Sequence, residues 1–202
     1  MDRTYGQYCG LARSLDHVGD RWTLLIVREL LVAPARYREL QEGLPGVATN
    51  LLAQRLRKLE ADGIVRRRFA EDGSTAVLYE LTALGADLED VVLTLVRWGT
   101  TWMQSGPGDD TFSPRWLVIA LRAVLPATPL SPATRLTIEC RNQPVNVRRD
   151  SNGLRVSLGV ATEPHATLSA DPEAVLALAT ETFTLDGLER AGSLRLDGSR
   201  AA

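Results

Sequence analysis

Three polar side chains on one predicted helix have the types and the spacing to read DNA bases. Asn50, Gln54 and Arg57 fall on one face of that helix when each residue is turned by about 100°. Arginine can form two hydrogen bonds with the edge of guanine, and asparagine or glutamine can do the same with adenine. The opposite face is apolar and predicts burial, with Leu52, Leu56 and Leu59. The pattern therefore favours a recognition helix for the major groove.

Basic side chains surround this helix in the sequence. Between residues 36 and 68 the chain has eight basic and four acidic residues, an excess of four positive charges in a chain of formal net charge −2. A local basic patch is the electrostatic pattern expected where a protein contacts phosphates. The other residues predicted to contact DNA are Arg36, Arg38, Thr49, Arg55, Lys58, Arg66, Arg67 and Arg68. The alternative is an ordinary solvated surface, because runs of charge usually have no other role.

The flanking segments fit a winged helix-turn-helix. Helices are predicted over residues 9–19, 22–31 and 36–42, ahead of the candidate recognition helix. That helix ends at Gly63, and a strand with three consecutive arginines follows. A turn at residues 71–74 leads to a second strand, so the two strands would form a hairpin that serves as the wing.

Polar residues ahead of apolar runs predict where the helices start. Asp20 is the expected N-cap of the second helix, and Thr49 is the expected N-cap of the recognition helix. Thr82 is the expected cap of a long helix over residues 82–104.

The predicted helix over residues 82–104 carries an apolar stripe that includes two tryptophans. A winged helix is closed without this extra element, so the stripe needs a partner, and a second copy of the chain is the favoured one. The predicted dimer interface comprises Leu88, Val91, Leu95, Trp98 and Trp102. The alternative is that the stripe packs on the chain's own first helix or on its C-terminal part.

The pattern changes after a Gly-, Pro- and Asp-containing linker at residues 105–111. A helix over residues 112–125 is followed by alternating strands, with helices expected from Pro172, capped by Asp171, and from residue 183. The predicted strands cover residues 135–140, 145–149, 154–158, 167–169 and 193–198. The fold class is α+β, with an N-terminal domain over residues 1–104 and a C-terminal domain over residues 112–202.

The first half resembles the HxlR family of bacterial winged-helix regulators over residues 6–104. The resemblance rests on LDHVGDRWTLLI at 15–26, RYREL at 36–40, LPGV at 44–47, RLRKLEADGIV at 55–65 and YELT at 79–82. It implies a homodimer that binds a pseudo-palindromic DNA operator.

The second half resembles a small sterol-carrier-protein-type domain over residues 112–199. The resemblance rests on ATLSADPEAV at 166–175 and LERAGSLRLDG at 188–198. It implies an apolar or lipid-like ligand held between the sheet and the helices. The candidate lining residues are Trp116, Ile119, Leu136, Ile138, Val147, Val156, Leu158, Leu176 and Phe183. Each could equally be an ordinary core residue.

Other chemistry is poorly supported. The two histidines, His17 and His165, lack the spacing of metal ligands, and neither a nucleophile elbow nor a glycine-rich phosphate loop occurs. We therefore expect no enzyme activity, no metal and no cofactor. Cys9 could sense oxidants or be a buried structural cysteine. With Cys140 it makes no disulfide framework, and the absence of a signal peptide or membrane span favours the cytoplasm.

Together these features predict a dimeric, sequence-specific transcriptional regulator that binds operator DNA and is controlled by a small apolar ligand in its C-terminal domain. In one alternative the C-terminal domain is a ligand-free structural or protein-interaction module. In another the chain is a lipid carrier with a degenerate winged helix.

Overall fold

The computed structural model describes residues 4–71, 75–103, 108–125, 130–180 and 182–199. The chain forms two compact units, Met1–Val92 and Leu93–Ala202. The division falls inside helix α6 (Glu89–Gly99), upstream of the linker predicted at residues 105–111. The predicted domain boundaries at 104 and 112 remain predictions.

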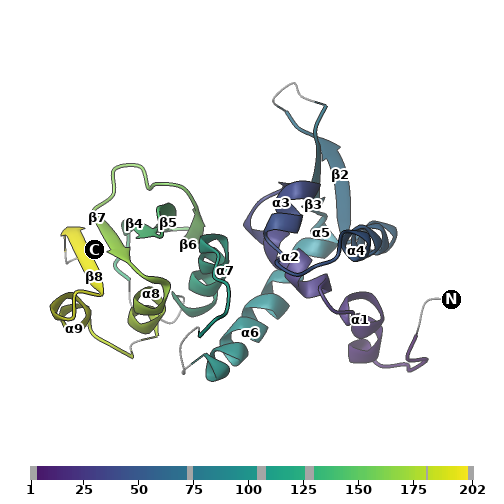
Figure 1. Ribbon diagram of the computed structural model, residues 1–202, viewed down its shortest axis with the longest axis horizontal. Helices are drawn as coiled ribbons and strands as arrows, with labels where there is room; N and C mark the ends of the chain where they lie inside the picture. Colours follow the sequence, from purple (N-terminus) through teal and green to yellow (C-terminus); the bar gives the residue numbers. More distant parts are fainter. Residues whose placement is uncertain (1–3, 72–74, 104–107, 126–129, 181, 200–202) are drawn as a thin grey trace. The chain divides into compact units, whose positions relative to one another are not determined.

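The N-terminal unit begins with the helices that the sequence predicts. They are α1 (Gly10–Val18), α2 (Thr23–Val32), α3 (Tyr37–Glu42) and α4 (Thr49–Ala61), coloured purple to blue in Figure 1. A two-residue strand that the sequence did not predict, β1 (Ala35–Arg36), lies between α2 and α3.

The wing is an antiparallel hairpin of β2 (Val65–Phe69) and β3 (Val77–Leu81). β1 pairs with the other edge of β3, which gives a sheet in the order β1-β3-β2. The hairpin prediction is therefore confirmed. Most of its predicted turn, residues 72–74, lies outside the described residues.

Two predicted N-caps are wrong. Trp22, in a left-handed conformation with φ 78°, occupies the cap position of α2, because the Asp20 carboxylate is held by Arg55 at 2.9 Å. Ala48 occupies the cap position of α4, and Thr49 is the first residue of the helix. The side chain of Thr49 instead accepts a hydrogen bond from Gln41 Nε2 at 2.8 Å.

The core of the N-terminal unit lies between the helices and the small sheet. Its buried residues are Val18, Ile26, Leu30, Ala35, Leu40, Leu44, Val47, Leu52, Leu56, Leu59, Ile64 and Val65. The predicted leucine face of α4 is thus confirmed. One charged side chain is also buried: Glu29 accepts from Arg28 Nη2 at 2.7 Å. Burying one charge without its partner would be costly, and Arg28 Nη2 also donates to Gly43 O at 3.4 Å, which links α2 to the end of α3.

The long helix predicted over residues 82–104 is divided. It consists of α5 (Ala83–Ala86), α6 and a final 3₁₀ turn, η1 (Thr100–Trp102). Leu88 N–H bonds to Gly85 O at 3.2 Å, which makes a tight turn between the two α segments. The predicted cap is confirmed, since Thr82 Oγ1 accepts from Gly85 N–H at 3.2 Å.

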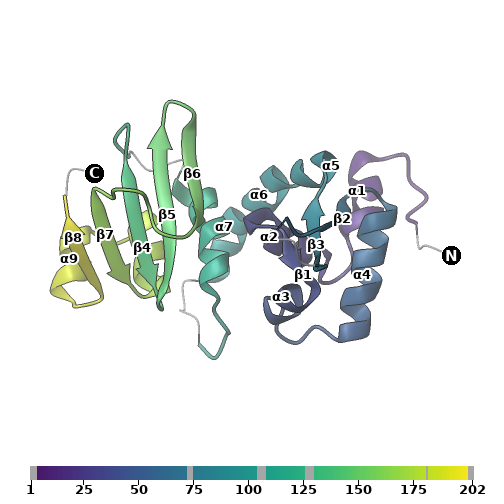
Figure 2. The ribbon, with the colours of Figure 1, turned by 90° about the horizontal axis from the view of Figure 1, so that it is seen from above.

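The C-terminal unit pairs a five-stranded sheet with helices. The sheet contains β4 (Arg135–Cys140), β5 (Gln143–Asp150), β6 (Gly153–Leu158), β7 (Ala166–Ala170) and β8 (Leu194–Gly198). Their order is β6-β5-β4-β7-β8, and Figure 2 shows the strands side by side. Only the β4–β7 pair is parallel.

Helices α7 (Pro114–Val124) and α8 (Pro172–Ala179) contact each other, and α7 packs on β5 and β6. Pro172 is at the start of α8, as predicted. The last helix, α9 (Leu185–Arg190), begins two residues later than expected, because Thr184 caps it by accepting from Gly187 N–H. The α+β class and the predicted strands are confirmed.

No helix within the described ranges has both the length and the hydropathy needed to span a membrane.

Candidate nucleic-acid interface

Two hydrogen bonds fix the turn between α3 and α4. Tyr37 Oη donates to Thr49 O at 2.7 Å, and Gln41 Nε2 donates to Thr49 Oγ1 at 2.8 Å. Both contacts reach the first residue of α4 from the preceding helix. They set the angle at which α4 leaves the turn, which is the geometry that matters when a recognition helix enters a groove.

The face of α4 opposite the core carries the predicted base-reading set. Asn50, Gln54 and Arg57 are all exposed. Asn50 Oδ1 accepts from Leu51 N–H at 2.9 Å, and this bond does not use the two donors of the amide NH₂ group. Within the described ranges, Gln54 and Arg57 have no hydrogen-bond partner in the protein. The three side chains are therefore brought together and are available to an external ligand.

Two basic residues of α4 are engaged inside the protein. The side chain of Arg55, only 16% exposed, pairs with Asp20 at 2.9 Å. Lys58 Nζ lies 3.1 Å from Asp62 Oδ2, and His17 Nδ1 lies 3.0 Å from the same oxygen. These contacts tie α4 to α1 and to the segment before α2. The predicted phosphate contacts of Arg55 and Lys58 remain predictions.

The shared carboxylate of Asp62 responds to both partners. Burial by itself would raise the pKa of Asp62, but hydrogen bonds from His17 and Lys58 outweigh burial and hold that pKa below its ordinary value. Asp62 is therefore ionised at neutral pH and joins the ends of α1 and α4.

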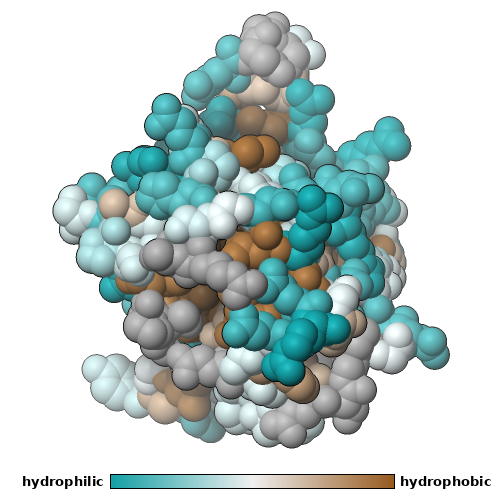
Figure 3. Space-filling model, turned by 90° about the vertical axis from the view of Figure 1, so that its left-hand side faces the viewer, coloured by the Kyte–Doolittle hydropathy of each residue, from teal (hydrophilic) through white to brown (hydrophobic). Residues whose placement is uncertain are grey.

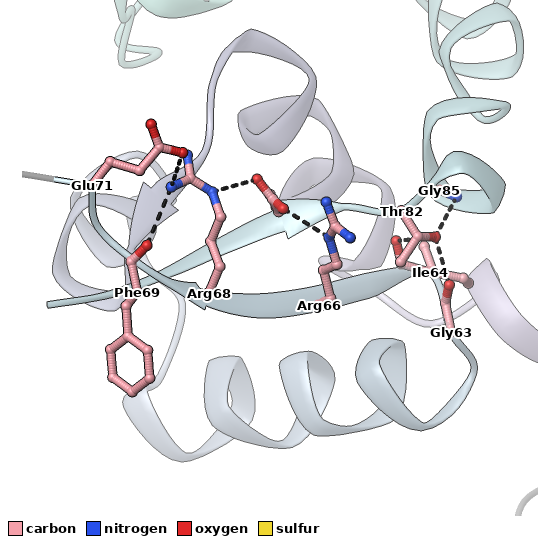
Figure 4. Close-up of polar contacts among 9 residues, drawn as sticks. Gly63, Ile64, Arg66, Arg68, Phe69, Glu71, Thr82 and Gly85 are labelled. Carbon is pink, nitrogen blue, oxygen red and sulfur yellow. Dashed lines mark hydrogen bonds and ion pairs between the residues drawn. The ribbon is translucent and has the colours of Figure 1, made fainter. Parts of the chain in front are cut away.

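The three wing arginines point to two sides of β2. Arg66 Nε and Arg68 Nε each donate to Glu80, both at 2.7 Å (Figure 4). Arg67 lies on the other side and donates to Glu60 of α4 at 2.6 Å. Hydrogen bonds from Arg68 and Arg66 hold the pKa of Glu80 below its ordinary value. Sequence reasoning missed Glu60 and Glu80. For Glu80 the available signal was its opposite charge across the hairpin from Arg66, whereas Glu60 lies on α4 and had no such signal.

The remaining predicted contacts, Arg36 and Arg38, lie at the start of α3. Arg36 occupies the N-cap position, and its backbone N–H donates to Glu39 Oε2 at 2.6 Å. Arg38 pairs with Glu42 one turn later at 2.9 Å, and its side chain is almost fully exposed. An exposed pair of this kind is weak, so Arg38 can exchange its partner at little cost.

The apolar stripe of α6 lies on the surface. Val91, Leu95, Trp98 and Trp102 are all more than two-fifths exposed, and the two indole rings meet edge to face at 4.5 Å. Leu88 differs, because it packs against the core of the N-terminal unit. Leu84 and Met103, which are not part of the predicted dimer interface, are also exposed apolar residues.

A cavity of about 170 Å³ lies within the C-terminal unit. Three predicted lining residues, Leu136, Ile138 and Val147, border it. The others lining it are Leu121, Leu125, Leu130, Leu168, Val175, Leu178, Ala179, Leu185, Leu196 and Ser199. Figure 3 views the chain from the side on which β8 and α9 lie in Figure 1, where apolar surface is visible among polar residues.

Six predicted lining residues do not border this cavity. They are Trp116, Ile119, Val156, Leu158, Leu176 and Phe183. Phe183 precedes α9 and is 58% exposed, so its predicted place within the helix is wrong, while its role as a lining residue remains a prediction. The helical and strand periods identified apolar positions correctly, but they could not distinguish a cavity wall from packed core.

The two cysteines have opposite environments. Cys9 occupies the N-cap position of α1 and is exposed, so its description as an ordinary buried cysteine is wrong. Burial raises the pKa of the Cys140 thiol to about 11, so this residue remains a thiol at neutral pH. Across the described ranges, no group of three or more His, Cys, Asp or Glu side chains could hold a metal ion.

The exposed polar face of α4, its fixed turn from α3 and the adjoining hairpin define the class of winged helix-turn-helix proteins. The family model for HxlR-like helix-turn-helix proteins matches residues 17–107. The HTH-type transcriptional regulator YodB of Bacillus subtilis is 34% identical over 92 residues, which are 46% of this chain and 80% of that protein. The regulator sll1512 of Synechocystis is 32% identical over 99 residues, 49% of this chain and 73% of its own length. The chain belongs to the HxlR-like helix-turn-helix family.

Among solved structures, the reduced form of YodB from B. subtilis is 31% identical. That match covers 50% of this chain and 99% of the other, with a TM-score of 0.42. The relatives are transcriptional regulators of helix-turn-helix type, so the protein is a regulator of this type and not an enzyme. Each of these matches covers half of this chain or less and says nothing about the cavity.

Proposed function

We propose that this protein is a dimeric, sequence-specific DNA-binding regulator whose α4 helix reads bases through Asn50, Gln54 and Arg57. The observation that carries the proposal is that these three side chains are exposed together, opposite the buried Leu face of the same helix. An amphipathic helix of this kind can lie in the major groove while its core side stays packed.

The wing and α3 would supply the contacts to the DNA backbone. Arg66 and Arg67 have side chains that are more than half exposed, and Arg38 is almost fully exposed. Guanidinium groups suit phosphate because they present several N–H donors in one plane. Such contacts orient the protein on the duplex without reading sequence.

Dimerisation would place two α4 helices on the two halves of an operator. The support is the exposed stripe of Val91, Leu95, Trp98 and Trp102, since a contiguous aromatic and aliphatic surface is typical of interface cores. A two-fold dimer reads a two-fold symmetric site, and the distance between recognition helices then fixes the half-site spacing.

The C-terminal cavity would hold a small apolar ligand that controls operator binding. Among the described residues that line it, the walls are almost entirely aliphatic, and Ser199 is the one of polar type. An apolar cavity of about 150 Å³ in a protein interior can hold benzene, so the volume here suits a single aromatic ring or a short branched alkyl chain. Such a ligand alters regulation only if its affinity differs between two arrangements of the dimer.

A second candidate is that the C-terminal unit acts as a structural or interaction module. The small volume of the cavity favours this alternative over a carrier of long lipids, because a long acyl chain would need a larger space.

Selection of duplexes from a random-sequence library on the purified full chain tests the DNA-binding proposal. We expect enrichment of a pseudo-palindromic sequence by the wild type and no enrichment by a variant with Asn50, Gln54 and Arg57 all changed to alanine. Enrichment of the same sequence by that variant would overturn the assignment of the reading face. Failure of the wild type to select any duplex at low salt, where phosphate contacts are strongest, would overturn DNA binding itself.

A further inference from the structure

Glu80 lies between two of the wing arginines. It comes from β3, directly opposite Arg66 in the register of the hairpin, while Arg68 lies one diagonal position away on the same face of β2. Each arginine donates through Nε to a different oxygen of the carboxylate, and both distances are 2.7 Å. The Glu80 side chain is only 14% exposed, so it is enclosed by the groups that it binds.

The two arginines present their remaining donors differently. Arg68 Nη1 donates to Phe69 O at 3.3 Å and to Glu71 Oε1 at 3.5 Å, so that side chain is directed along its own strand (Figure 4). Arg66 has no hydrogen bond from Nη1 or Nη2 to any described residue, and its side chain is 67% exposed. Because its Nε is fixed by Glu80, the Arg66 guanidinium has a preset orientation, and its two Nη groups remain as donors that no described residue uses.

An unpaired arginine on a hairpin would sample many rotamers and would lose that freedom when it bound a phosphate. A carboxylate that already holds Nε removes part of this loss before DNA arrives. Glu80 is ionised at neutral pH because the arginine hydrogen bonds lower its pKa, so this restraint persists under ordinary conditions.

We infer that Glu80 is a positioning residue of the wing. It fixes the orientation of the Arg66 guanidinium for a DNA phosphate, and Arg68 in turn holds the Glu80 carboxylate in place. The inference rests on the proposed function, since it concerns the same DNA interface. Removal of the Glu80 carboxylate distinguishes positioning from simple charge repulsion. A carboxylate near DNA repels phosphate, so simple Coulomb reasoning expects its removal to tighten binding. If Glu80 positions Arg66, removal of its carboxylate should instead weaken binding to the preferred sequence.

The test compares Glu80→Gln with the wild type on two duplexes, one selected by the wild-type protein from a random library and one with the same bases in scrambled order. We expect Glu80→Gln to weaken binding to the selected duplex by about five- to tenfold, as for a lost preorganising contact, while binding to the scrambled duplex stays equal or tightens. Tighter binding of both duplexes would overturn the inference and leave Glu80 as a screening charge only.

Glu80→Asp separates geometry from charge. It keeps the carboxylate but is one methylene shorter, so it cannot reach both arginines. Positioning predicts that it weakens selected-duplex binding as Glu80→Gln does, whereas wild-type binding by this variant would contradict positioning. Glu71→Gln is the matched control, because it removes a fully solvated carboxylate, 91% exposed, that also neighbours Arg68. This control should not weaken binding.

The coupling to Arg66 supplies a readout that a purely structural role would not give. Arg66→Ala should weaken selected-duplex binding in the wild type and have a smaller effect in the Glu80→Gln background. Equal effects in the two backgrounds would show that Glu80 does not act through Arg66. Circular dichroism of each variant confirms that the wing domain is folded, and Glu80→Asp stands in if Glu80→Gln is not. If the wild type selects no duplex, the DNA-binding proposal has failed rather than this one.

Discussion

Neighbouring arginines of one helix have different surroundings in this protein. Arg55 is turned toward the body of the N-terminal unit and pairs with Asp20, while Arg57 points outward from the same helix. Residues i and i+2 of an α-helix are separated by about 200° around the helix axis, so they cannot share a face. Both arginines count equally in the net charge of the sequence. In the structure, Arg55 forms an internal ion pair, whereas Arg57 is available to an external ligand.

We predict that Arg57→Ala weakens binding to the selected operator by about 1–3 kcal/mol and relaxes the preference at one base position. The expected cause is the loss of two hydrogen bonds to a guanine edge. Measured affinities on a panel of single-base operator variants test this. Arg55→Ala is the matched control and should instead lower the free energy of unfolding, because it leaves Asp20 without its arginine. Uniform weakening by Arg57→Ala on every duplex would identify a phosphate contact.

A second residue-scale prediction concerns acid stability. The pKa of Asp62 is lowered in the folded state, so its ionised form stabilises the fold above its unfolded pKa near 3.8. This contribution is lost as the pH falls through the lowered folded value. We expect Asp62→Asn to reduce the free energy of unfolding at pH 7 by about 1 kcal/mol or less, and the difference from wild type to shrink below pH 3.8. Urea unfolding at several pH values measures this, and a difference that persisted at the lowest pH would argue against the ionic origin.

At the scale of elements, the passage from wing to α6 depends on one glycine. Gly85 packs so closely on the N-terminal unit that a Cβ there would lie 2.1 Å from Ile64 O. Thr82 Oγ1 donates to Gly63 O at 2.6 Å and also accepts from Gly85 N–H, so the start of α5 is tied to the end of α4 (Figure 4). This close approach fixes α5 against Ile64, and the turn from Gly85 to Leu88 then divides the predicted single helix before α6.

Gly85→Ala should therefore destabilise the N-terminal unit, by about 1–3 kcal/mol, since either the backbone or the helix must move. Gly99→Ala, at the end of α6, is the matched control because its Cβ would meet no atom within 4 Å. Replacing a glycine by alanine in a helix normally stabilises by up to about 1 kcal/mol. Thermal unfolding of both variants measures the contrast, and equal behaviour of the two would contradict the close contact.

The exposed stripe of α6 gives a second element-scale prediction. Leu95 lies at the centre of the stripe, and a charge there would have to be desolvated in any apolar interface. We expect Leu95→Glu to shift the protein from dimer to monomer in sedimentation experiments and to weaken operator binding. Asp90→Lys changes the charge on the face of α6 that is turned by about 140° from Leu95, and it should leave the dimer intact. A dimeric Leu95→Glu variant would mean that another surface joins the two copies.

At the scale of the whole molecule, the proposed sensing role depends on whether the C-terminal cavity binds a ligand. Ala179 borders the cavity, while Ala174 of the same helix is buried outside it. Leucine at position 179 would extend into open space, but leucine at position 174 would have to displace packed atoms. Comparing these two leucine variants therefore distinguishes the effect of filling the cavity from the effect of overpacking the core.

We predict that toluene or indole raises the Tm of the wild-type protein and does not raise that of Ala179→Leu. The Tm of Ala179→Leu without ligand should equal or exceed that of the wild type, whereas Ala174→Leu should unfold at a lower temperature. Equal responses of wild type and Ala179→Leu to both compounds would show that they bind elsewhere. No response in the wild type would favour the structural-module alternative.

Much of the fold could be predicted because hydrophobic periodicity depends on local sequence. The leucine face of α4, the β2–β3 hairpin and the five strands of the C-terminal sheet were predicted from spacing and turn residues. The caps of α2 and α4 could not be predicted in this way, because Asp20 and Thr49 are used by Arg55 and Gln41 from other elements. A side chain that bonds to a partner distant in the sequence is no longer available to cap the helix beside it.

The sequence by itself determined the class of the protein, the helix α4 and its outward polar set, because these follow from residue types and helical spacing. Only the tertiary structure decided which basic side chains remain available. It joins Glu80 to Arg66 and Arg68, Asp20 to Arg55, and Asp62 to Lys58. It also decided which apolar side chains border the cavity. Contacts between residues far apart in the chain depend on how elements pack, and periodicity within one element carries no information about them.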